Sequence, residues 1–148
     1  MSLRRFTSIL TVVLALAPIS FGLRFLLDPH GAASGFGIDP WPTGNAAGYF
    51  LVKAGRDLFM GIVLLVLFAL RERRATAIAM ALVTMVPIVD MITVFTHGGS
   101  AATALGIHGL TALIVAADAY LLFRTIKPTE AAAALESSGT QSVAADHS

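Results

Sequence analysis

The chain has 148 residues, of which 56% are hydrophobic and only 13% are charged, with a mean hydropathy of +0.80 and a formal net charge of +1. Soluble domains carry about 25% charged residues, so this composition indicates an integral membrane protein and gives no case for nucleic-acid binding. The absence of cysteine excludes disulfides, thiolate metal sites and cysteine nucleophiles. We expect one membrane domain over 1–127, with no metal site and no cofactor.

Four apolar stretches are long enough to cross a bilayer, because a spanning helix needs about 20 apolar residues. They run over 6–27, 49–70, 76–96 and 102–123. An even number of spans with short connections predicts an all-α fold, a four-helix antiparallel transmembrane bundle. Small residues on the fourth stretch would let a neighbouring helix pack closely. They are Gly106, Gly109, Ala112, Ala116 and Ala119.

The first stretch also has features of a secretory signal. Arg4 and Arg5 precede it, and the small residues at 15–17 resemble a cleavage site. However, Pro18 would follow the cut, where it is poorly tolerated, and the apolar run continues to Leu27. We therefore expect a retained transmembrane helix, kinked at Pro18 because proline removes a backbone donor.

Basic residues gather on one side of the predicted spans, at 4–5, 71–74 and 124–127. The connections 28–48 and 97–101 contain no Lys or Arg. By the positive-inside rule, both termini and the turn 71–74 are cytoplasmic. We expect a multi-pass protein of a plasma membrane of the bacterial type. We interpret the arginines of the turn as a topology anchor, with an anionic-lipid site as the alternative.

The outer connection 28–48 is rich in Gly and Pro, which argues against a regular helix. It either lies on the membrane or forms a lid over whatever lies beneath. Trp41 and Tyr49 suit the headgroup level. The tail 128–148 contains few large apolar residues, so we expect it to be disordered and cytoplasmic.

Ionisable residues lie within or at the edge of all four stretches. A charge there costs at least about 2.5–3.5 kcal/mol unless it is paired or wetted. Given the predicted topology, the charges of four helices fall within about 10 Å of the outer face. This coincidence predicts a polar pocket in the outer half of the bundle. The residues assigned to it are Arg24, Arg56, Asp57, Asp90, His97 and His108.

Two readings of this cluster stay open. In a wet pocket, Asp90 and His108 would exchange protons while Arg24 and Arg56 hold an anionic or carbonyl group. Alternatively, Arg56 and Asp90 form only an interhelical ion pair, and His108 is a neutral core histidine bonded to a carbonyl or to a threonine. Arg56 is expected to pair with Asp90 in preference to Asp57, because consecutive helix residues point about 100° apart.

Two further ionisable residues are given mainly structural roles. Lys53 is spaced to pair with Asp57, four residues on, but its long stem favours an ammonium group that extends outward. Asp118 lies near the cytoplasmic end of the fourth stretch. We interpret it as an interfacial residue that reaches Arg124 or water.

Four short motifs occur along the chain, and their order and spacing resemble those of a known family. They are GLRFLLDP at 22–29, GFGI at 35–38, GRDL at 55–58 and PIVD at 87–90. Over 8–124 the chain resembles a family of small four-helix membrane proteins described as domain of unknown function 4267. More loosely, it is similar to DoxX-type four-helix membrane proteins. The resemblance implies an integral membrane protein, singles out Arg24, Arg56, Asp57 and Asp90, and implies no particular activity.

The leading functional hypothesis is a pocket that binds a small lipophilic or amphipathic molecule. Any chemistry in it would be proton transfer, such as an isomerisation or a cyclisation, because the groups available are carboxylate, imidazole and guanidinium. The alternative is a non-catalytic membrane subunit or transport accessory whose charges hold the bundle together. Expected neighbours are membrane lipid, the small ligand and, as candidate partners, a second copy of the chain or another membrane protein.

Overall fold

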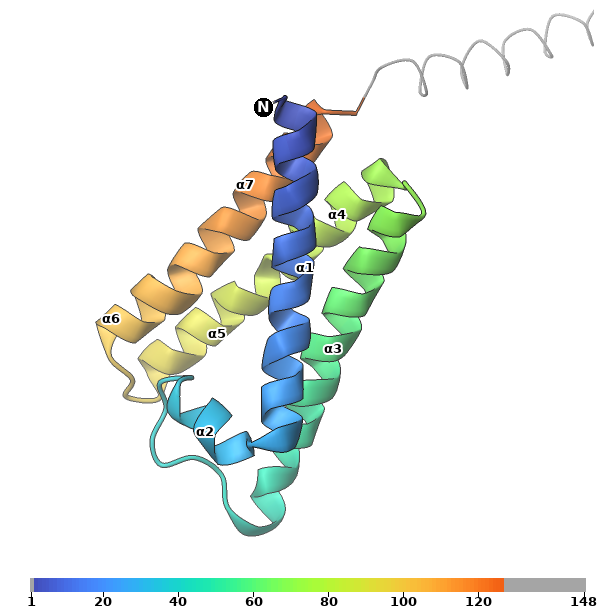
Figure 1. Ribbon diagram of the computed structural model, residues 1–148. Helices are drawn as coiled ribbons and strands as arrows, with labels where there is room; N and C mark the ends of the chain where they lie inside the picture. The colour runs from blue at the N-terminus through green and yellow to red at the C-terminus, as the bar shows by residue number, and fades with distance from the viewer. Residues whose placement is uncertain (1, 127–148) are drawn as a thin grey trace, which may run out of the picture.

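A computed structural model of the chain describes residues 2–126, and these are helical without any strand (Figure 1). The predicted all-α class is thus confirmed, while the predicted tail 128–148 lies outside the described residues. The elements in chain order are α1 (Leu3–Leu27), α2 (Pro29–Ser34), η1 (Gly44–Ala47), α3 (Gly48–Ala69), α4 (Arg73–Val83), α5 (Met85–Thr96), α6 (Ala101–Thr103), the π-helical η2 (Ala104–Gly109) and α7 (Leu110–Arg124).

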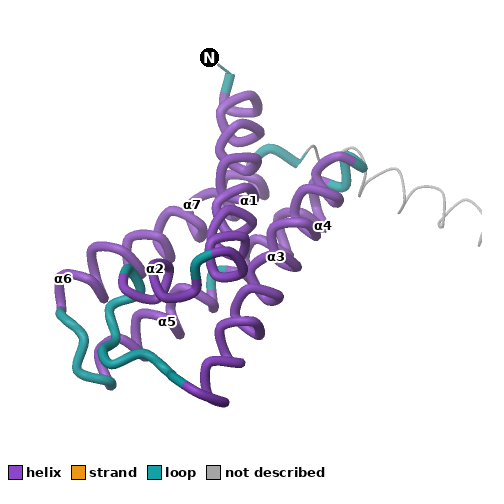
Figure 2. Tube along the Cα trace, turned by 60° about the horizontal axis from the view of Figure 1, so that its bottom comes forward, coloured by secondary structure: helices purple, strands orange, loops and turns teal. Residues whose placement is uncertain are grey.

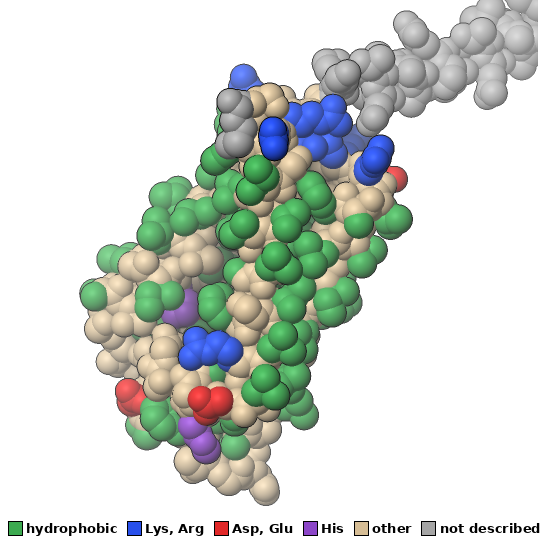
Figure 3. Space-filling model, viewed as in Figure 1, with side chains coloured by type: hydrophobic (Ala, Val, Ile, Leu, Met, Phe, Trp, Pro, Cys, Tyr) green, Lys and Arg blue, Asp and Glu red, His purple; other side chains and the backbone are tan. Residues whose placement is uncertain are grey.

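Three helical segments are long and apolar enough to cross a membrane, namely Leu3–Leu27, Arg73–Thr96 and Ala101–Arg124. The α3 helix has 22 residues but carries Lys53, Arg56 and Asp57 within them, which sets it apart from the other three. Many large apolar side chains lie on the outside, and Figure 3 shows them spread over much of one face of the molecule. An exposed apolar surface of this kind suits lipid contact, so the fold is consistent with a multi-pass membrane protein.

The long helices pack as two pairs. The α1 helix runs along α3, while α4 packs on α7 and α5 packs on η2 (Figure 1). Close contact between α1 and α3 depends on two glycines. A Cβ atom on Gly22 would lie 2.8 Å from the carbonyl oxygen of Ala54, and one on Gly61 would lie 2.5 Å from that of Ala15. Either Cβ would push the two backbones apart.

Small residues of the fourth stretch contribute less to packing than the sequence predicts. Ala112 and Ala119 are buried, and a Cβ atom on Gly109 would lie 3.1 Å from Met91 Sδ. Gly106 and Ala116 instead lie on the exposed side. The tight backbone approaches at Gly22 and Gly61 instead lie between α1 and α3, a pair that the small residues of the fourth stretch do not predict.

The connection after α1 contains a short helix where an irregular segment was predicted. Pro29 occupies the first turn of α2, where its missing N–H costs nothing. The Asp28 carboxylate caps this turn by accepting a hydrogen bond from the Gly31 N–H at 3.0 Å. Beyond α2 the chain crosses toward α6, where Gly37 lies close against Thr103 (Figure 2).

Proline affects two of the long segments differently. The third predicted span is divided at Thr84 into α4 and α5. Pro87 has no N–H to donate to the carbonyl of Val83, so the helix loses a hydrogen bond at that point. Pro18, by contrast, lies inside α1, which continues without interruption.

Most of the buried apolar side chains fall into two separate clusters, toward opposite ends of α1 and α3. The first joins α1, α3, α4 and α7 and consists of Ala15, Leu64, Ala77, Met80, Val115, Ala119 and Leu122. The second joins α1, α2 and α3 and consists of Phe25, Ala33, Phe50 and Ala54. Arg24, Asp57, Asp90 and His108, four of the predicted site residues, line a cavity near these clusters.

Candidate functional site

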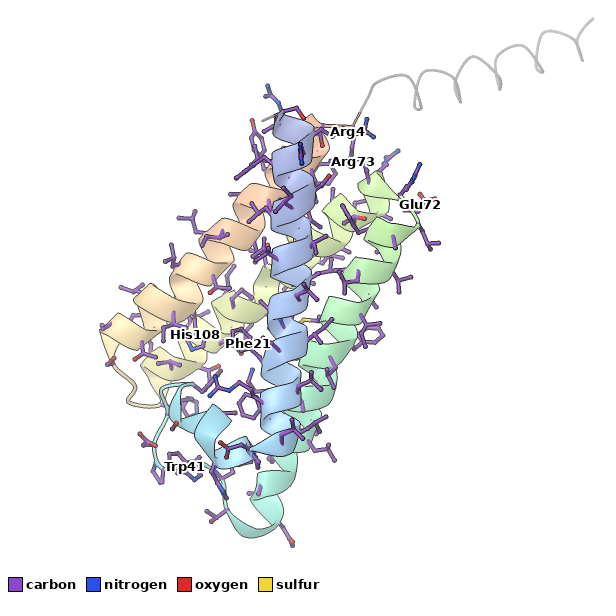
Figure 4. The ribbon with its side chains drawn as sticks, viewed as in Figure 1. Arg4, Phe21, Trp41, Glu72, Arg73 and His108 are labelled. Atoms are coloured by element: carbon purple, nitrogen blue, oxygen red, sulfur yellow. The ribbon has the colours of Figure 1, made fainter. Side chains whose placement is uncertain are left out.

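A cavity of about 220 Å³ lies between α1 and α2 on one side and α3, α5 and η2 on the other. Most of its wall is apolar, with aromatic side chains from α1 and from the loop that follows α2. Figure 4 labels Phe21 and His108, two of the lining residues, next to each other beside α1. The ionisable residues of the wall are Arg24, Lys53, Asp57, Asp90 and His108.

Two acids and two bases from α3 and α5 form a compact cluster beside the cavity. Lys53 Nζ lies 3.2 Å from Asp57 Oδ2 and 3.6 Å from Asp90 Oδ2. Arg56 Nε lies 3.0 Å from Asp57 Oδ1, and its two terminal nitrogens lie 3.5 Å from the two oxygens of Asp90. The four formal charges cancel, which makes the cluster tolerable in a low-dielectric environment. We call these four residues the paired cluster.

The predicted pairing of Arg56 needs correction. Arg56 does contact Asp90, but its shorter contact is with Asp57, whose Cβ direction on the helix differs from that of Arg56 by about 100°. The 100° rule describes Cβ directions, whereas Nε lies far enough along the side chain to bend back to the neighbouring carboxylate. Arg56 does not line the cavity, and 37% of its side chain is exposed.

Lys53 is the residue that the sequence reading left out of the site. Its ammonium group points inward and lies 5.2 Å from the ring centroid of Phe25 and 4.9 Å from that of Phe36. Cation–π contacts and the Asp57 carboxylate hold it there. The four-residue spacing from Lys53 to Asp57 was the available signal, and the preference for an outward ammonium group obscured it.

His108 lies in the π-helical segment η2 and anchors the connection that follows α2. Its Nε2 lies 3.0 Å from the carbonyl oxygen of Phe36, and the two rings are 5.0 Å apart between centroids. Since a carbonyl oxygen can only accept, Nε2 is the donor in this contact. Of the two structural partners considered from the sequence, the carbonyl is the one found, because Thr111 donates to Ile107 instead.

π-Helical turns occur often at functional sites, since the extra residue turns a side chain away from the regular helical phase. The sequence predicts an ordinary helix over 102–123, and two glycines in this segment are the only local hint of the irregularity. His108, Thr111 and Val115 nonetheless all line the cavity, as expected from their shared face.

The remaining predicted site residues occupy different positions. Arg24 is exposed at the cavity wall and forms no ion pair with any residue in 2–126. His97 is exposed at the end of α5, where Nδ1 lies 2.9 Å from the Thr93 carbonyl oxygen. It does not line the cavity. The structure thus brings together four of the six residues at the wall, with Arg56 behind it and His97 apart.

Asp118 is not the interfacial residue that the sequence suggests. It is fully buried, and its Oδ2 accepts a hydrogen bond from Thr11 at 2.8 Å. Its Oδ1 has no hydrogen-bond partner among the described residues. Arg124, the expected partner, bonds the hydroxyl of Tyr120. Helix α1 supplies the hydroxyl, so only the packed structure reveals the burial.

The described residues contain no cluster of side chains that could hold a metal ion. Across residues 2–126, no three His, Asp or Glu side chains lie close enough to hold an ion. The chemistry available at the cavity is therefore that of carboxylate, imidazole, ammonium and guanidinium groups. These groups hold anions and carbonyl oxygens and transfer protons.

The family model described as "Domain of unknown function (DUF4267)" matches residues 15–122 of the chain. The chain belongs to this family, as the order of its motifs predicts. The matched range includes every residue of the paired cluster and the cavity residues Arg24 and His108. Searches of curated proteins and of solved structures found no match.

Proposed function

We propose that this DUF4267 protein binds a small, mainly apolar molecule in the cavity between α1 and α5. The ligand carries a carboxylate or a carbonyl group, which Arg24 holds at the wall. The single observation behind the proposal is that the cavity combines an apolar interior with one cation, Arg24, that has no ion pair within 2–126. Mainly apolar pockets with a few polar groups are typical of ligand sites.

The proposal includes a membrane arrangement. The segments α1, α3, α4–α5 and α6–α7 form a four-helix antiparallel transmembrane bundle, with both termini and the turn 71–74 in the cytoplasm of a bacterial-type cell. The α3 helix can span despite its charges because Lys53, Arg56 and Asp57 neutralise one another together with Asp90. Topology reporters fused after residue 72 and after residue 100 should report opposite sides, and the same side would contradict the arrangement.

Access from the membrane follows from the surface around the cavity. Where Figure 4 labels His108, Figure 3 shows a histidine side chain visible among apolar ones, and 9% of His108 is exposed. In the proposed arrangement this face lies in the outer half of the bilayer, so a lipophilic ligand could enter from the lipid. Ligand pockets usually measure about 300–1,000 Å³, so the smaller volume here favours a compact ligand.

Proton transfer is the chemistry that we propose for this cavity. Asp90 and His108 both line it, one as a carboxylate within the paired cluster and one as an imidazole whose Nε2 is bound to the Phe36 carbonyl. A carbonyl group held by Arg24 would become more acidic at the adjacent carbon, because the guanidinium stabilises negative charge on the oxygen. Isomerisation of a small unsaturated ketone fits these groups.

The experiment tests occupancy with a photoreactive probe in native membranes. The probe is a medium-chain fatty acid that carries a diazirine, compared with its methyl ester. Ala17→Phe should abolish labelling, because Ala17 lines the cavity and a phenyl ring would fill it. Ala116→Phe is the matched control, since Ala116 is exposed on α7 and is no part of the cavity wall. Equal labelling of both variants would contradict the proposal.

A second arm tests the role of Arg24. Arg24→Gln should weaken labelling by the acid about tenfold or more and labelling by the methyl ester clearly less, because only the acid forms an ion pair with the guanidinium in addition to the hydrogen bond. The chemical step is tested by deuterium uptake into 3-cyclohexen-1-one, a small unsaturated ketone, with His108→Ala as the variant that lacks the imidazole. Binding without deuterium uptake would exclude proton transfer to this substrate, and the protein would then act as a carrier or a sensor of its ligand.

One observation favours the alternative of a non-catalytic membrane subunit. The paired cluster satisfies its own charges, as expected if it only fastens α3 to α5. Under this alternative, Ala17→Phe should label with the photoreactive probe as strongly as the unchanged protein does. The comparison of Ala17→Phe with Ala116→Phe therefore separates the two.

A further inference from the structure

A second cavity lies at the opposite end of the helices, beside the turn between α3 and α4. Its volume is about 370 Å³. Three arginines line it, together with one hydroxyl-bearing residue and an apolar side from α3 and α7. The lining consists of Arg4, Phe68, Ala69, Arg71, Arg73, Thr76 and Leu122. We call Arg4, Arg71 and Arg73 the arginine site.

The arginine site differs from the first cavity in its charge balance. None of its three arginines forms an ion pair with any residue in 2–126. Glu72, the neighbouring acid, is exposed and makes no ion pair within the same range. Figure 3 shows basic side chains gathered at this end, and Figure 4 labels Arg4 and Arg73 close together there. Like charges held close together repel one another, and an anion bound between them would relieve this repulsion.

Arg73 is positioned by neutral groups. Its terminal nitrogens donate to Ser8 Oγ at 3.3 Å, Thr7 Oγ1 at 3.2 Å and Thr125 Oγ1 at 3.0 Å. Three hydroxyls from α1 and from the end of α7 orient the guanidinium without cancelling its charge. An arginine held in this way is pre-organised, so less side-chain entropy is lost when it binds an anion.

Arg71 occupies a position that usually belongs to glycine. It follows the end of α3 with φ of +62°, while the Glu72 N–H donates to Leu67 O at 3.1 Å and the Arg71 N–H to Phe68 O at 3.0 Å. This is the Schellman pattern of helix ends, in which the left-handed residue is most often Gly. A strained arginine at the cavity, where glycine would be cheaper, points to a role for its side chain.

We infer that the arginine site binds a phosphate group, either that of an anionic lipid such as phosphatidylglycerol or a free phosphate compound. Guanidinium groups match phosphate oxygens in pairs, which makes arginine better suited to this than lysine. The apolar side at Phe68 and Leu122 suits the glycerol and first acyl carbons of a lipid. The site lies far from the first cavity along the helices, so it stands independently of the proposed ligand.

The experiment measures binding to the full-length protein by native mass spectrometry from a neutral detergent. One arm adds phosphatidylglycerol and, for comparison, phosphatidylcholine; the other adds inorganic phosphate and glycerol 3-phosphate. The test variant is Arg4→Gln with Arg71→Gln. The matched control is Arg5→Gln with Arg74→Gln, which changes the net charge equally at nearby positions of the chain but removes no cavity residue.

The site predicts that the test variant binds phosphatidylglycerol about 30-fold more weakly, since each basic residue near an anionic lipid contributes about 1 kcal/mol, a factor of roughly 5.4. The control should lose less than about threefold. Preference for phosphatidylglycerol over the water-soluble phosphates assigns the lipid as the source, and the reverse assigns a free phosphate compound. Equal losses in the two variants, or equal binding of phosphatidylcholine, would overturn the site in favour of a diffuse surface charge.

Discussion

The paired cluster and the arginine site differ in whether their charges are balanced by neighbouring side chains. In the paired cluster, α3 and α5 supply two acids and two bases within 3.0–3.6 Å, so the charges cancel beside the cavity. In the arginine site, three guanidinium groups gather around a second cavity without an ion pair among residues 2–126. Cancelled charges fasten helices together, whereas uncancelled charges recruit an anion from outside. The difference indicates which charges serve packing and which serve binding.

The largest effect should come from removing the acid at the centre of the paired cluster. Only 5% of the Asp57 side chain is exposed, and it contacts both Lys53 and Arg56. Asp57→Asn should lower the free energy of unfolding by about 3–5 kcal/mol, because Lys53 and Arg56 both lose the nearer of their two carboxylates and Asp90 alone faces two cations. The measurement is reversible unfolding in mixed detergent micelles.

Asp118→Asn is the matched control for this change. Asp118 is equally buried, but it accepts only from the Thr11 hydroxyl, and an amide oxygen can replace that acceptor. We expect a smaller loss than for Asp57→Asn, since Asp118 forms no ion pair within 2–126 and attracts Arg73 only from a longer distance. If both substitutions cost the same, burial alone would account for the result, and the pairing in the cluster would have no special importance.

A smaller effect should come from the Arg56–Asp90 contact. Each of Arg56→Gln and Asp90→Asn should destabilise the protein by about 1–2 kcal/mol, and the double variant should cost less than the sum, with a coupling energy of about 1 kcal/mol. The contact is longer than that to Asp57, and Arg56 is more exposed, which limits the coupling. Strict additivity in the double-mutant cycle would show that these two residues are not partners.

The arginine site should respond to geometry more than to charge at Arg73. Arg73→Lys keeps the positive charge, but an ammonium group cannot reach the three hydroxyls at once. We expect a loss of about 1 kcal/mol in the same unfolding measurement. An unchanged stability would indicate that the hydroxyls around Arg73 do not position it.

The smallest effects should come from Arg4→Gln and Arg71→Gln. Both side chains are exposed and form no ion pair in 2–126, so each change should stay within about 0.5 kcal/mol. Relative to the wild-type protein, the variants should be slightly more stable at low salt than at high salt. Each variant removes part of the mutual repulsion between the arginines, and salt screens this repulsion least at low concentration. Unfolding at two salt concentrations tests this. A large loss in either variant would mean that the arginine holds the fold together.

The sequence predicted the parts of the fold that depend on local pattern. Apolar length located the helices of 6–27, 49–70, 76–96 and 102–123 to within a few residues, apart from the break at Thr84 and the π-helical segment. Matching depth brought Arg24, Asp57, Asp90 and His108 to one cavity. These results need only the helical rise and the order of the spans.

What the sequence could not predict depends on where flexible side chains end. The outward reading of Lys53 and the surface reading of Asp118 both failed for this reason. The inward position of Lys53 depends on rings brought in by Phe25 and Phe36, and the burial of Asp118 depends on Thr11 from α1. The partner of His108 comes from a loop 72 residues away in the chain. Such contacts form only after the helices have packed.

The π-helical segment 104–109 has a consequence for comparing members of this family. One extra residue in a helical turn rotates everything before it by about 100° relative to everything after it. Two loop contacts depend on that rotation, because Thr103 before the extra residue meets Gly37 and His108 within the segment meets Phe36. A homologue whose alignment shows a one-residue gap in this segment can keep either contact but not both.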